Sequence, residues 1–169
     1  MRSQYLAALV FVGVSALAQT PNYQQVAEQV LPAVVTITGQ SDGGETLGSG
    51  FLVDPKGKIV TSLHVIRSLR TAKVRLPNGD VYDSIRVRAF DERRDIAVIQ
   101  VPGFGLPIAR LGDSNEVKQA EAVLLAGAGS GLQGSVTGGI VSAVRDLTDG
   151  FKVIQTDAAA NPGNSGARC

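Results

Sequence analysis

The sequence has few cysteines and histidines and almost no net charge. Each of these shortages excludes a structural feature or a class of function. The single cysteine, Cys169, has no partner for an intrachain disulfide, so the fold depends on its core alone. One histidine and one cysteine offer too few spaced ligands for a metal enzyme. The formal net charge of +1 gives no broad attraction to nucleic acid or to an anionic membrane, so neither is an expected partner.

Aromatic residues are also scarce, at 5% of the chain, whereas there are 20 glycines. This balance favours short strands and tight turns over a helical bundle. With 169 residues, 44% of them hydrophobic and 18% charged, the chain has the composition of an ordinary globular protein with one domain of useful size. The composition therefore favours an all-β fold.

The first 18 residues differ from the rest of the chain. They contain one positive charge at Arg2, an apolar run over residues 6–17, and a small-x-small pattern ending at Ala18. This pattern predicts a secretory signal peptide over residues 1–18, cleaved after Ala18, and a periplasmic or secreted domain over residues 19–169. The apolar run is shorter than the ~20 residues of a membrane-spanning helix, so we expect no stable membrane span after cleavage.

The remaining chain is predicted to form strands and one helix. Apolar spacing from Tyr23 to Leu31 indicates that helix, which Pro32 ends. Six short runs rich in Val, Ile and Thr follow, with turn residues at 54–57 and 77–80, and they suggest a small closed barrel. An irregular stretch at 102–119 connects to a second unit. The expected strands are 33–38, 48–53, 58–62, 73–76, 84–89 and 96–101 in the first unit, and 121–126, 135–144 and 151–156 in the second.

His64 and Asp95 are the first two candidates for chemistry. Histidine suits general acid–base catalysis, although a histidine at the end of a strand is more often merely hydrogen-bonded and partly buried. Asp95 heads an apolar strand. Burying a neutral polar group there without a hydrogen-bond partner would cost about 2–7 kcal/mol, and burying an unpaired carboxylate would cost more. It either caps the strand and faces water, or it accepts the Nδ1 hydrogen of His64 and fixes the ring tautomer.

Ser165 is the third candidate and lies in the turn sequence Gly-Asn-Ser-Gly over residues 163–166. As a bare pattern this is ordinary turn chemistry. A nucleophilic serine, however, needs a tight turn whose N–H groups converge on a developing oxyanion, and glycine permits such backbone angles. The N–H groups of Gly163 and Ser165 are the candidate oxyanion-hole donors.

The three residues follow the chain order of chymotrypsin-type enzymes, His64, Asp95 and then Ser165. Around them, the chain from about Tyr23 to Gly166 resembles the HtrA/Deg family of trypsin-like serine proteases. Five ordered motifs carry the resemblance: residues 48–51, 61–65, 95–99, 137–142 and 155–166.

The resemblance implies two perpendicular six-stranded barrels with the active site between them, His64 and Asp95 coming from the first and Ser165 from the second. It implies a serine endopeptidase that cleaves unfolded or misfolded proteins in the cell envelope through an acyl-enzyme, without a cofactor. It also implies a homotrimer that forms through the N-terminal segment, where Tyr23 is a candidate contact. The loop at 145–150 corresponds to a regulatory sensor loop in the family and is short here.

The sequence departs from the family pattern after Gly166. The family continues with a second glycine, a proline, an apolar residue and further strands, whereas this chain reads Ala-Arg-Cys and ends. We therefore expect a chymotrypsin-like double β-barrel whose first barrel is complete and whose second barrel is incomplete, with no PDZ domain. Unpaired strand edges and a missing pocket wall predict that the 169-residue chain is poorly active or inactive.

Two other functions have some support in the sequence. Residues 129–134 fit the dinucleotide-binding pattern G-x-G-x-x-G, but residues 135–144 read as a strand where that site needs a helix. The stronger alternative is a catalytically impaired protease-fold protein that only binds polypeptide or a partner. The presence of His64, Asp95 and Ser165 together speaks against it, and an active-site probe distinguishes the two.

Overall fold

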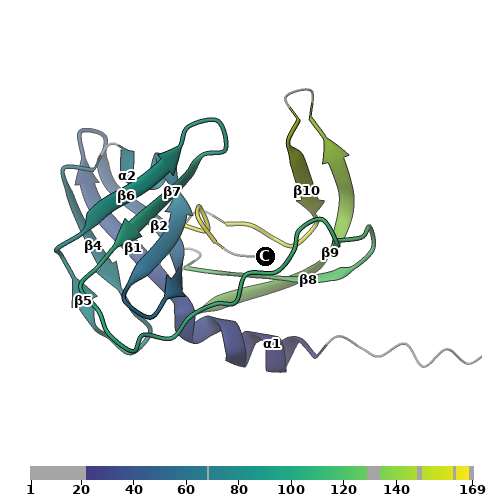
Figure 1. Cartoon of the computed structure of the whole chain (residues 1–169), viewed down its shortest axis with the longest axis horizontal. Coiled ribbons are helices and arrows are strands. Elements are labelled where there is room, and N and C mark those ends of the chain that lie inside the picture. Colours follow the sequence, from purple (N-terminus) through teal and green to yellow (C-terminus); the bar gives the residue numbers. More distant parts are fainter. Residues whose placement is uncertain (1–21, 68, 129–133, 148–149, 162, 168–169) are drawn as a thin grey trace, which may run out of the picture.

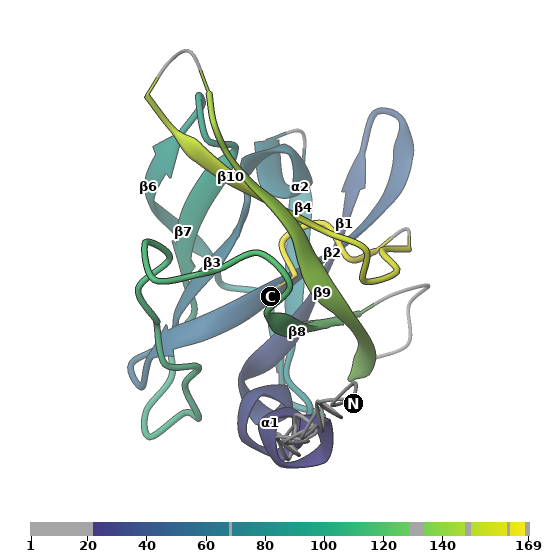
Figure 2. The ribbon, with the colours of Figure 1, turned by 90° about the vertical axis from the view of Figure 1, so that its right-hand side faces the viewer.

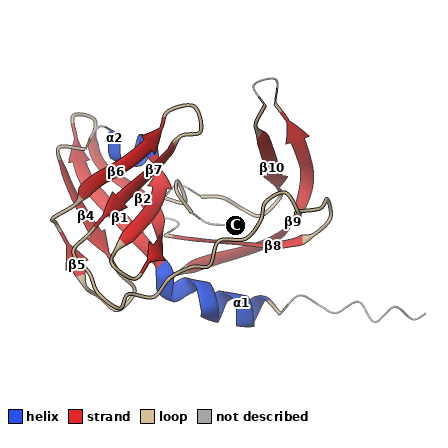
Figure 3. Cartoon of the chain, viewed as in Figure 1, coloured by secondary structure: helices blue, strands red, loops and turns tan. Residues whose placement is uncertain are grey.

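The computed structural model describes residues 22–67, 69–128, 134–147, 150–161 and 163–167. Strands in two antiparallel sheets are the main regular elements of this structure and far outnumber the helical segments, so the all-β prediction is confirmed (Figures 1 and 3). The expected signal peptide at residues 1–18 lies outside the described residues and stays a prediction.

The larger sheet has seven strands in the order β5-β4-β1-β2-β3-β7-β6 and curls round on itself (Figure 1). All six strands expected in the first unit are present, and the two-residue strand β5 is an addition. Both predicted turns connect paired strands, β2 to β3 and β4 to β5. The strands are β1 (Val34–Ser41), β2 (Gly44–Asp54), β3 (Lys58–Ser62), β4 (Thr71–Arg75), β5 (Val81–Tyr82), β6 (Arg86–Asp91) and β7 (Ile96–Gln100).

The smaller sheet consists of the three strands that the sequence predicts, and their order is β10-β9-β8. They are β8 (Ala122–Gly127), β9 (Ser135–Asp146) and β10 (Lys152–Thr156). Because β9 is a strand, the segment after the glycine-rich run provides no helix N-terminus for a pyrophosphate, which contradicts the dinucleotide alternative. Residues 129–133 of that run lie outside the described residues.

Two helices flank the sheets. The predicted helix is α1 (Tyr23–Val30). Asn22 caps its first turn, because Asn22 Oδ1 accepts a hydrogen bond from the backbone N–H of Gln25 at 3.0 Å. It runs beneath the smaller sheet (Figure 2), where the Tyr23 hydroxyl donates to the carbonyl of Gly139 at 3.4 Å. The prediction of a single helix was wrong, because a second one, α2 (Leu63–Arg67), follows β3 directly. With five residues it is too short to show a helical period.

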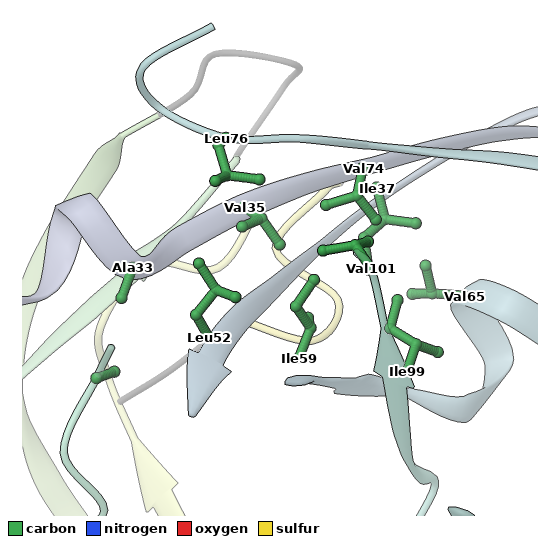
Figure 4. Packing of buried hydrophobic residues seen from close by; sticks show 11 residues of the cluster. Ala33, Val35, Ile37, Leu52, Ile59, Val65, Val74, Leu76, Ile99 and Val101 are labelled. Atoms are coloured by element: carbon green, nitrogen blue, oxygen red, sulfur yellow. The ribbon is translucent and has the colours of Figure 1, made fainter. Parts of the chain in front are cut away.

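The hydrophobic core fills the inside of the seven-stranded sheet (Figure 4). Side chains from neighbouring strands meet there, with Ile37 of β1, Leu52 of β2, Ile59 of β3 and Ile99 of β7 fully buried. The rest of the cluster consists of Ala33, Val35, Val65, Val74, Leu76, Val101 and Ala109. Since no disulfide is available, this cluster is the main source of stability for the element that positions His64 and Asp95.

Ile37→Ala is expected to lower the free energy of unfolding by about 2–5 kcal/mol, because it opens a cavity among close-packed side chains. Urea unfolding followed by circular dichroism measures the change. Phe104→Ala is the matched control, since the Phe104 side chain is 92% exposed and its loss should change stability by less than about 0.5 kcal/mol. Equal losses in the two variants would contradict this placement of the core.

The smaller sheet, by contrast, exposes apolar side chains. Val136, Ile140 and Val144 of β9 and Val153 and Ile154 of β10 are all exposed. Of the helices in the described ranges, none has the length and apolar character needed to cross a bilayer.

Candidate active site

His64 is placed by the pairing of β3 with β7. The register sets Ser62 opposite Ile96, so the residues just beyond these partners meet at the end of the sheet. There the chain turns into α2, and the backbone N–H of Leu63 donates to the carbonyl of Asp95 at 3.0 Å. The backbone N–H of His64 donates to Asp95 Oδ1 at 2.8 Å. The first turn of α2 is therefore anchored on Asp95.

The side chains of the same two residues are also joined. His64 Nδ1 lies 2.5 Å from Asp95 Oδ2. Because an ionised carboxylate only accepts hydrogen bonds, this contact places the proton on Nδ1 and leaves Nε2 as an acceptor. The pair is open to solvent, with the His64 side chain 58% and the Asp95 side chain 47% exposed. Of the two alternatives for Asp95, the structure therefore has the carboxylate paired with His64.

The electrostatics of Asp95 follow from these contacts. Partial burial acts to raise the pKa of its carboxyl, but the hydrogen bonds from the ring and the backbone N–H of His64 together outweigh it, with a smaller contribution from the charge of Arg67. The pKa of Asp95 therefore lies below its ordinary value. The carboxylate is ionised at neutral pH and can stabilise a protonated imidazole.

The backbone of Asp95 is unusual as well. Its φ of +53° lies in the left-handed region, which costs a non-glycine residue about 1–2 kcal/mol. Asp95 sits one position before β7 begins at Ile96, and this turn directs both carboxylate oxygens at α2. Backbone strain at this position is thus associated with a specific orientation of the carboxylate.

The loop that carries Ser165 begins on the smaller sheet. Asp157 Oδ1 accepts the backbone N–H of Ile140 at 2.7 Å, and Thr137 Oγ1 donates to the carbonyl of Ala159 at 2.8 Å. Gly139 has no side chain where the loop crosses β9, and a Cβ there would lie 2.5 Å from the backbone nitrogen of Ala158. The motif at 137–142 therefore supports the start of the loop.

The end of the loop is held by the larger sheet, through Ser49 of β2. The backbone N–H of Ser49 donates to the carbonyl of Ser165 at 2.7 Å. The Ser49 hydroxyl donates to the carbonyl of Gly163 at 2.7 Å and accepts the backbone N–H of Ala128 at 2.8 Å. Sequence reasoning assigned no role to Ser49. A buried hydroxyl within an apolar strand is the signal that could have found it, because such a group needs hydrogen-bond partners.

The loop also fits closely beside His64. Gly166 has a φ of +80°, and a Cβ on it would lie 2.2 Å from the carbonyl oxygen of Ser49 and 3.0 Å from the backbone nitrogen of Ser62. Only glycine satisfies both requirements at this position. In the described part of the chain, however, the Ser165 hydroxyl makes no hydrogen bond to the ring of His64. Such bonds are often long before a substrate binds.

Gly163 and Ser165, which carry the two candidate oxyanion donors, have carbonyls that accept hydrogen bonds. The carbonyls of Gly163 and Ser165 both accept from Ser49. Among the described residues, neither N–H of this pair donates a hydrogen bond. Gly163 adopts a φ of +94°, in the left-handed region that favours glycine. Two free N–H groups on one tight turn can donate to an oxygen that enters beside Ser165.

The smaller sheet also reaches the turn that precedes Asp95. The hairpin between β9 and β10 places Phe151 under two guanidinium groups, with 4.7 Å from Arg93 Cζ and 4.2 Å from Arg94 Cζ to the ring centroid. Residues 148–149 of the expected sensor loop lie outside the described residues.

Other sites find no support in the described residues. No group of three or more His, Cys, Asp or Glu is arranged there to bind a metal ion. A cavity of about 570 Å³ inside the larger sheet is lined by Ile66, Leu69, Lys73, Asp83 and Val87 among others, and it includes none of the three candidate residues. The site thus combines an imidazole oriented by Asp95 with the Ser165 hydroxyl and two N–H groups that have no acceptor among the described residues.

Comparison with known proteins gives matches over most of the chain. A family model described as "Trypsin-like peptidase domain" matches residues 48–168. A probable periplasmic serine endoprotease DegP-like of Ectopseudomonas mendocina (strain ymp) is 39% identical over 150 residues, covering 86% of this chain and 31% of the relative. The mitochondrial serine protease HTRA2 of Bos taurus is 41% identical over 156 residues, covering 83% and 34%.

The solved structures that match are of the same kind. The HtrA-type protease AlgW with tripeptide superposes with a TM-score of 0.77 at 31% identity, over 87% of this chain and 50% of that chain. This likeness bears out the expected chymotrypsin-like fold. The chain spans about a third of the length of the curated relatives and about half of the solved one.

Proposed function

Because the chain belongs to the HtrA/Deg family of trypsin-like serine proteases, we propose that it is a serine endopeptidase that uses His64, Asp95 and Ser165. One observation carries the proposal: Asp95 binds both the ring and the backbone N–H of His64, at 2.5 and 2.8 Å. The loop that carries Ser165 packs at Gly166 against Ser62, two residues before His64. A binding-only protein has no physical need of this pairing.

In the first half of the reaction, Ser165 Oγ attacks the carbonyl carbon of the scissile peptide bond. His64 Nε2 accepts the hydroxyl proton, and the ionised Asp95 stabilises the imidazolium that forms. The negative charge that develops on the substrate oxygen is stabilised by the N–H groups of Gly163 and Ser165. The protonated His64 then gives its proton to the leaving amine, the C–N bond breaks, and an acyl-enzyme remains on Ser165.

In the second half, water takes the place of the amine. His64 Nε2 accepts a proton from the water, whose oxygen attacks the acyl carbon. The same two N–H groups stabilise the second tetrahedral oxyanion. His64 returns the proton to Ser165 Oγ as the ester bond breaks, which releases the carboxylic acid and restores the serine.

The proposed substrates are unfolded or misfolded polypeptides in the periplasm. The names of the periplasmic relatives and the signal peptide expected at residues 1–18 support this location. A homotrimer through the N-terminal segment is part of the proposal. Tyr23, its candidate contact, already packs against Gly138 and Gly139 of its own chain.

A fluorophosphonate probe provides the test, because only a serine with a working general base and oxyanion donors reacts quickly. We expect the chain to be labelled on Ser165, as located by peptide mass spectrometry, and to cleave unstructured casein, both slowly, in line with the poor activity predicted from its sequence. Ser165→Ala should abolish both signals while thermal unfolding stays within a few degrees of the wild type.

The alternative function predicts a different result. A catalytically impaired chain that only binds polypeptide or a partner would fold, retain casein or peptide affinity, and leave the probe unreacted. The exposed apolar side chains of β9 and β10 are the observation that favours such binding. Labelling of Ser165 together with casein cleavage excludes it.

A further inference from the structure

We propose that Ser49 is a positioning residue of the active site, which orients the oxyanion donors through the two carbonyls that it binds. The inference deepens the endopeptidase function proposed above and rests on it. The Ser49 clamp is defined here as Ser49 with its three hydrogen-bond partners in other segments: the carbonyls of Gly163 and Ser165 and the N–H of Ala128.

The clamp acts on the peptide units around the donors. The bond from Ser49 Oγ fixes the peptide plane between Gly163 and Asn164, and the bond from Ser49 N fixes the plane that follows Ser165. The N–H of Ser165 belongs to the peptide unit between Asn164 and Ser165, which lies between these two fixed planes, and the N–H of Gly163 belongs to the unit just before the first of them. Fixing the neighbouring planes therefore limits the rotation left to both N–H groups. Glycine at 163, with its φ of +94°, has wide rotational freedom, so an external contact is needed to select one orientation.

The position of Ser49 requires a hydroxyl. Its oxygen donates to the carbonyl of Gly163 and accepts from the N–H of Ala128 at the same time, which uses both capacities of the group. Ser49 is 0% exposed, so water has no access to replace a lost hydrogen bond. Its own carbonyl accepts from Thr61 Oγ1 at 2.7 Å, which ties the clamp to the strand that leads into His64. One residue thus relates the loop of Ser165, the end of β8 and the strand before His64.

A neighbouring residue offers a matched control. Thr36 of β1 lies directly opposite Ser49 in the β1–β2 register and is only 5% exposed. Among the residues that the structure describes, its Oγ1 finds no hydrogen-bond partner. Thr36→Val therefore removes a buried hydroxyl from the same pair of strands without removing any contact of the Ser165 loop.

The test compares Ser49→Ala, Thr36→Val and the wild-type 169-residue chain. Three quantities are measured: the rate of fluorophosphonate labelling of Ser165, the affinity for a peptide boronate, and the affinity for a peptide of the same sequence without the boronate. Boronate binding and labelling require aligned oxyanion donors, whereas peptide binding does not. In Ser49→Ala we expect labelling and boronate affinity to fall about 10²-fold, the loss typical of a 1 Å misplacement. Peptide affinity should stay within about threefold, and Thr36→Val should match the wild type.

A folded Ser49→Ala variant with unchanged boronate affinity would overturn the proposal, as would equal losses of boronate and peptide affinity. If Ser49→Ala does not fold, Ser49→Cys replaces it, since a thiol has similar size but forms weaker hydrogen bonds. It should lower boronate affinity more than peptide affinity. Equal losses of the two affinities would again overturn the proposal.

Hydrogen exchange separates failure of this inference from failure of the proposed function. If the wild-type chain reacts with no probe, the endopeptidase proposal fails. The clamp is then judged by exchange at Ala128 and over residues 163–167. Ser49→Ala should raise the rate of exchange at least about tenfold, because loss of a buried hydrogen bond favours local opening. Thr36→Val should leave the rate of exchange unchanged. Unchanged exchange in Ser49→Ala would rule out the clamp.

Discussion

His64→Ala is expected to lower kcat by about 10⁶-fold, the loss typical when the base of a catalytic triad is removed. His64 is the only histidine of the chain, so no other imidazole can take its place. Without it, Ser165 has no group to accept its proton during the attack. The rate of cleavage of a labelled, unstructured casein under saturating conditions measures the change.

The same variant should remain folded, because the ring of His64 is 58% exposed and takes no part in the core. Its thermal unfolding should lie within a few degrees of the wild type, as should that of Phe104→Ala, which keeps full activity. A loss of less than about 10²-fold would show that another group acts as the base and would contradict the assignment.

Asp95→Asn is expected to lower kcat by about 10⁴-fold with little change in the structure. The reason lies in the two contacts of Asp95. The backbone N–H of His64 needs an acceptor, so the amide oxygen of asparagine occupies the place of Oδ1. The amide NH₂ then faces His64 Nδ1, which must accept a hydrogen bond and cannot bear a proton. The proton moves to Nε2, and the ring can no longer take one from Ser165.

NMR of the imidazole nitrogens gives this prediction a direct readout. When the ring is neutral, the wild type should have its proton on Nδ1 and the variant should have it on Nε2. Retention of the Nδ1 proton together with normal turnover would contradict the argument. A loss of activity caused by unfolding instead would appear as a lowered melting temperature.

The acid dependence of stability follows from the same pair. The pKa of Asp95 is lowered in the folded state, so its contribution to stability is complete above the ordinary carboxyl pKa. That contribution is lost as the pH falls through the lower pKa of the folded protein. The difference in unfolding free energy between the wild type and Asp95→Asn should therefore shrink over this acidic interval.

The strands could be predicted from the sequence because alternation and turn chemistry are local. The turn at 54–57 separates β-branched runs, and the structure pairs its flanking strands as expected. The turn at 77–80 also connects paired strands, but its second strand is β5 and not the expected strand at 84–89. The helix α2 and the strand β5 were missed because they contain five and two residues, too few for any period to appear. Both depend on tertiary contacts, as the anchoring of α2 on Asp95 illustrates.

The candidate site was predictable in its chemistry and not in its support. His64, Asp95 and Ser165 stand out because their side chains suit acyl transfer and their order follows a known pattern. A hydroxyl in an apolar strand indicates that Ser49 needs hydrogen-bond partners, but it does not say which residues they are, because two of them lie more than a hundred positions away. The bond from Ser49 Oγ to Gly163 spans 114 positions. Long-range pairing of this kind cannot be derived from local spacing.

The long sequence separation between Ser49 and Gly163 has a consequence for folding during synthesis. All the strands of the larger sheet, from β1 to β7, lie in the first part of the chain, and domains generally begin to fold from the N-terminal side during synthesis. A nascent chain can therefore bring His64 and Asp95 together while residues 163–166 are still inside the ribosome. Closing so long a loop comes late, because its entropy must be paid before its contacts form. The loop of Ser165, the proposed nucleophile, therefore docks after the larger sheet has formed, and until then the paired His64 and Asp95 have no hydroxyl to activate.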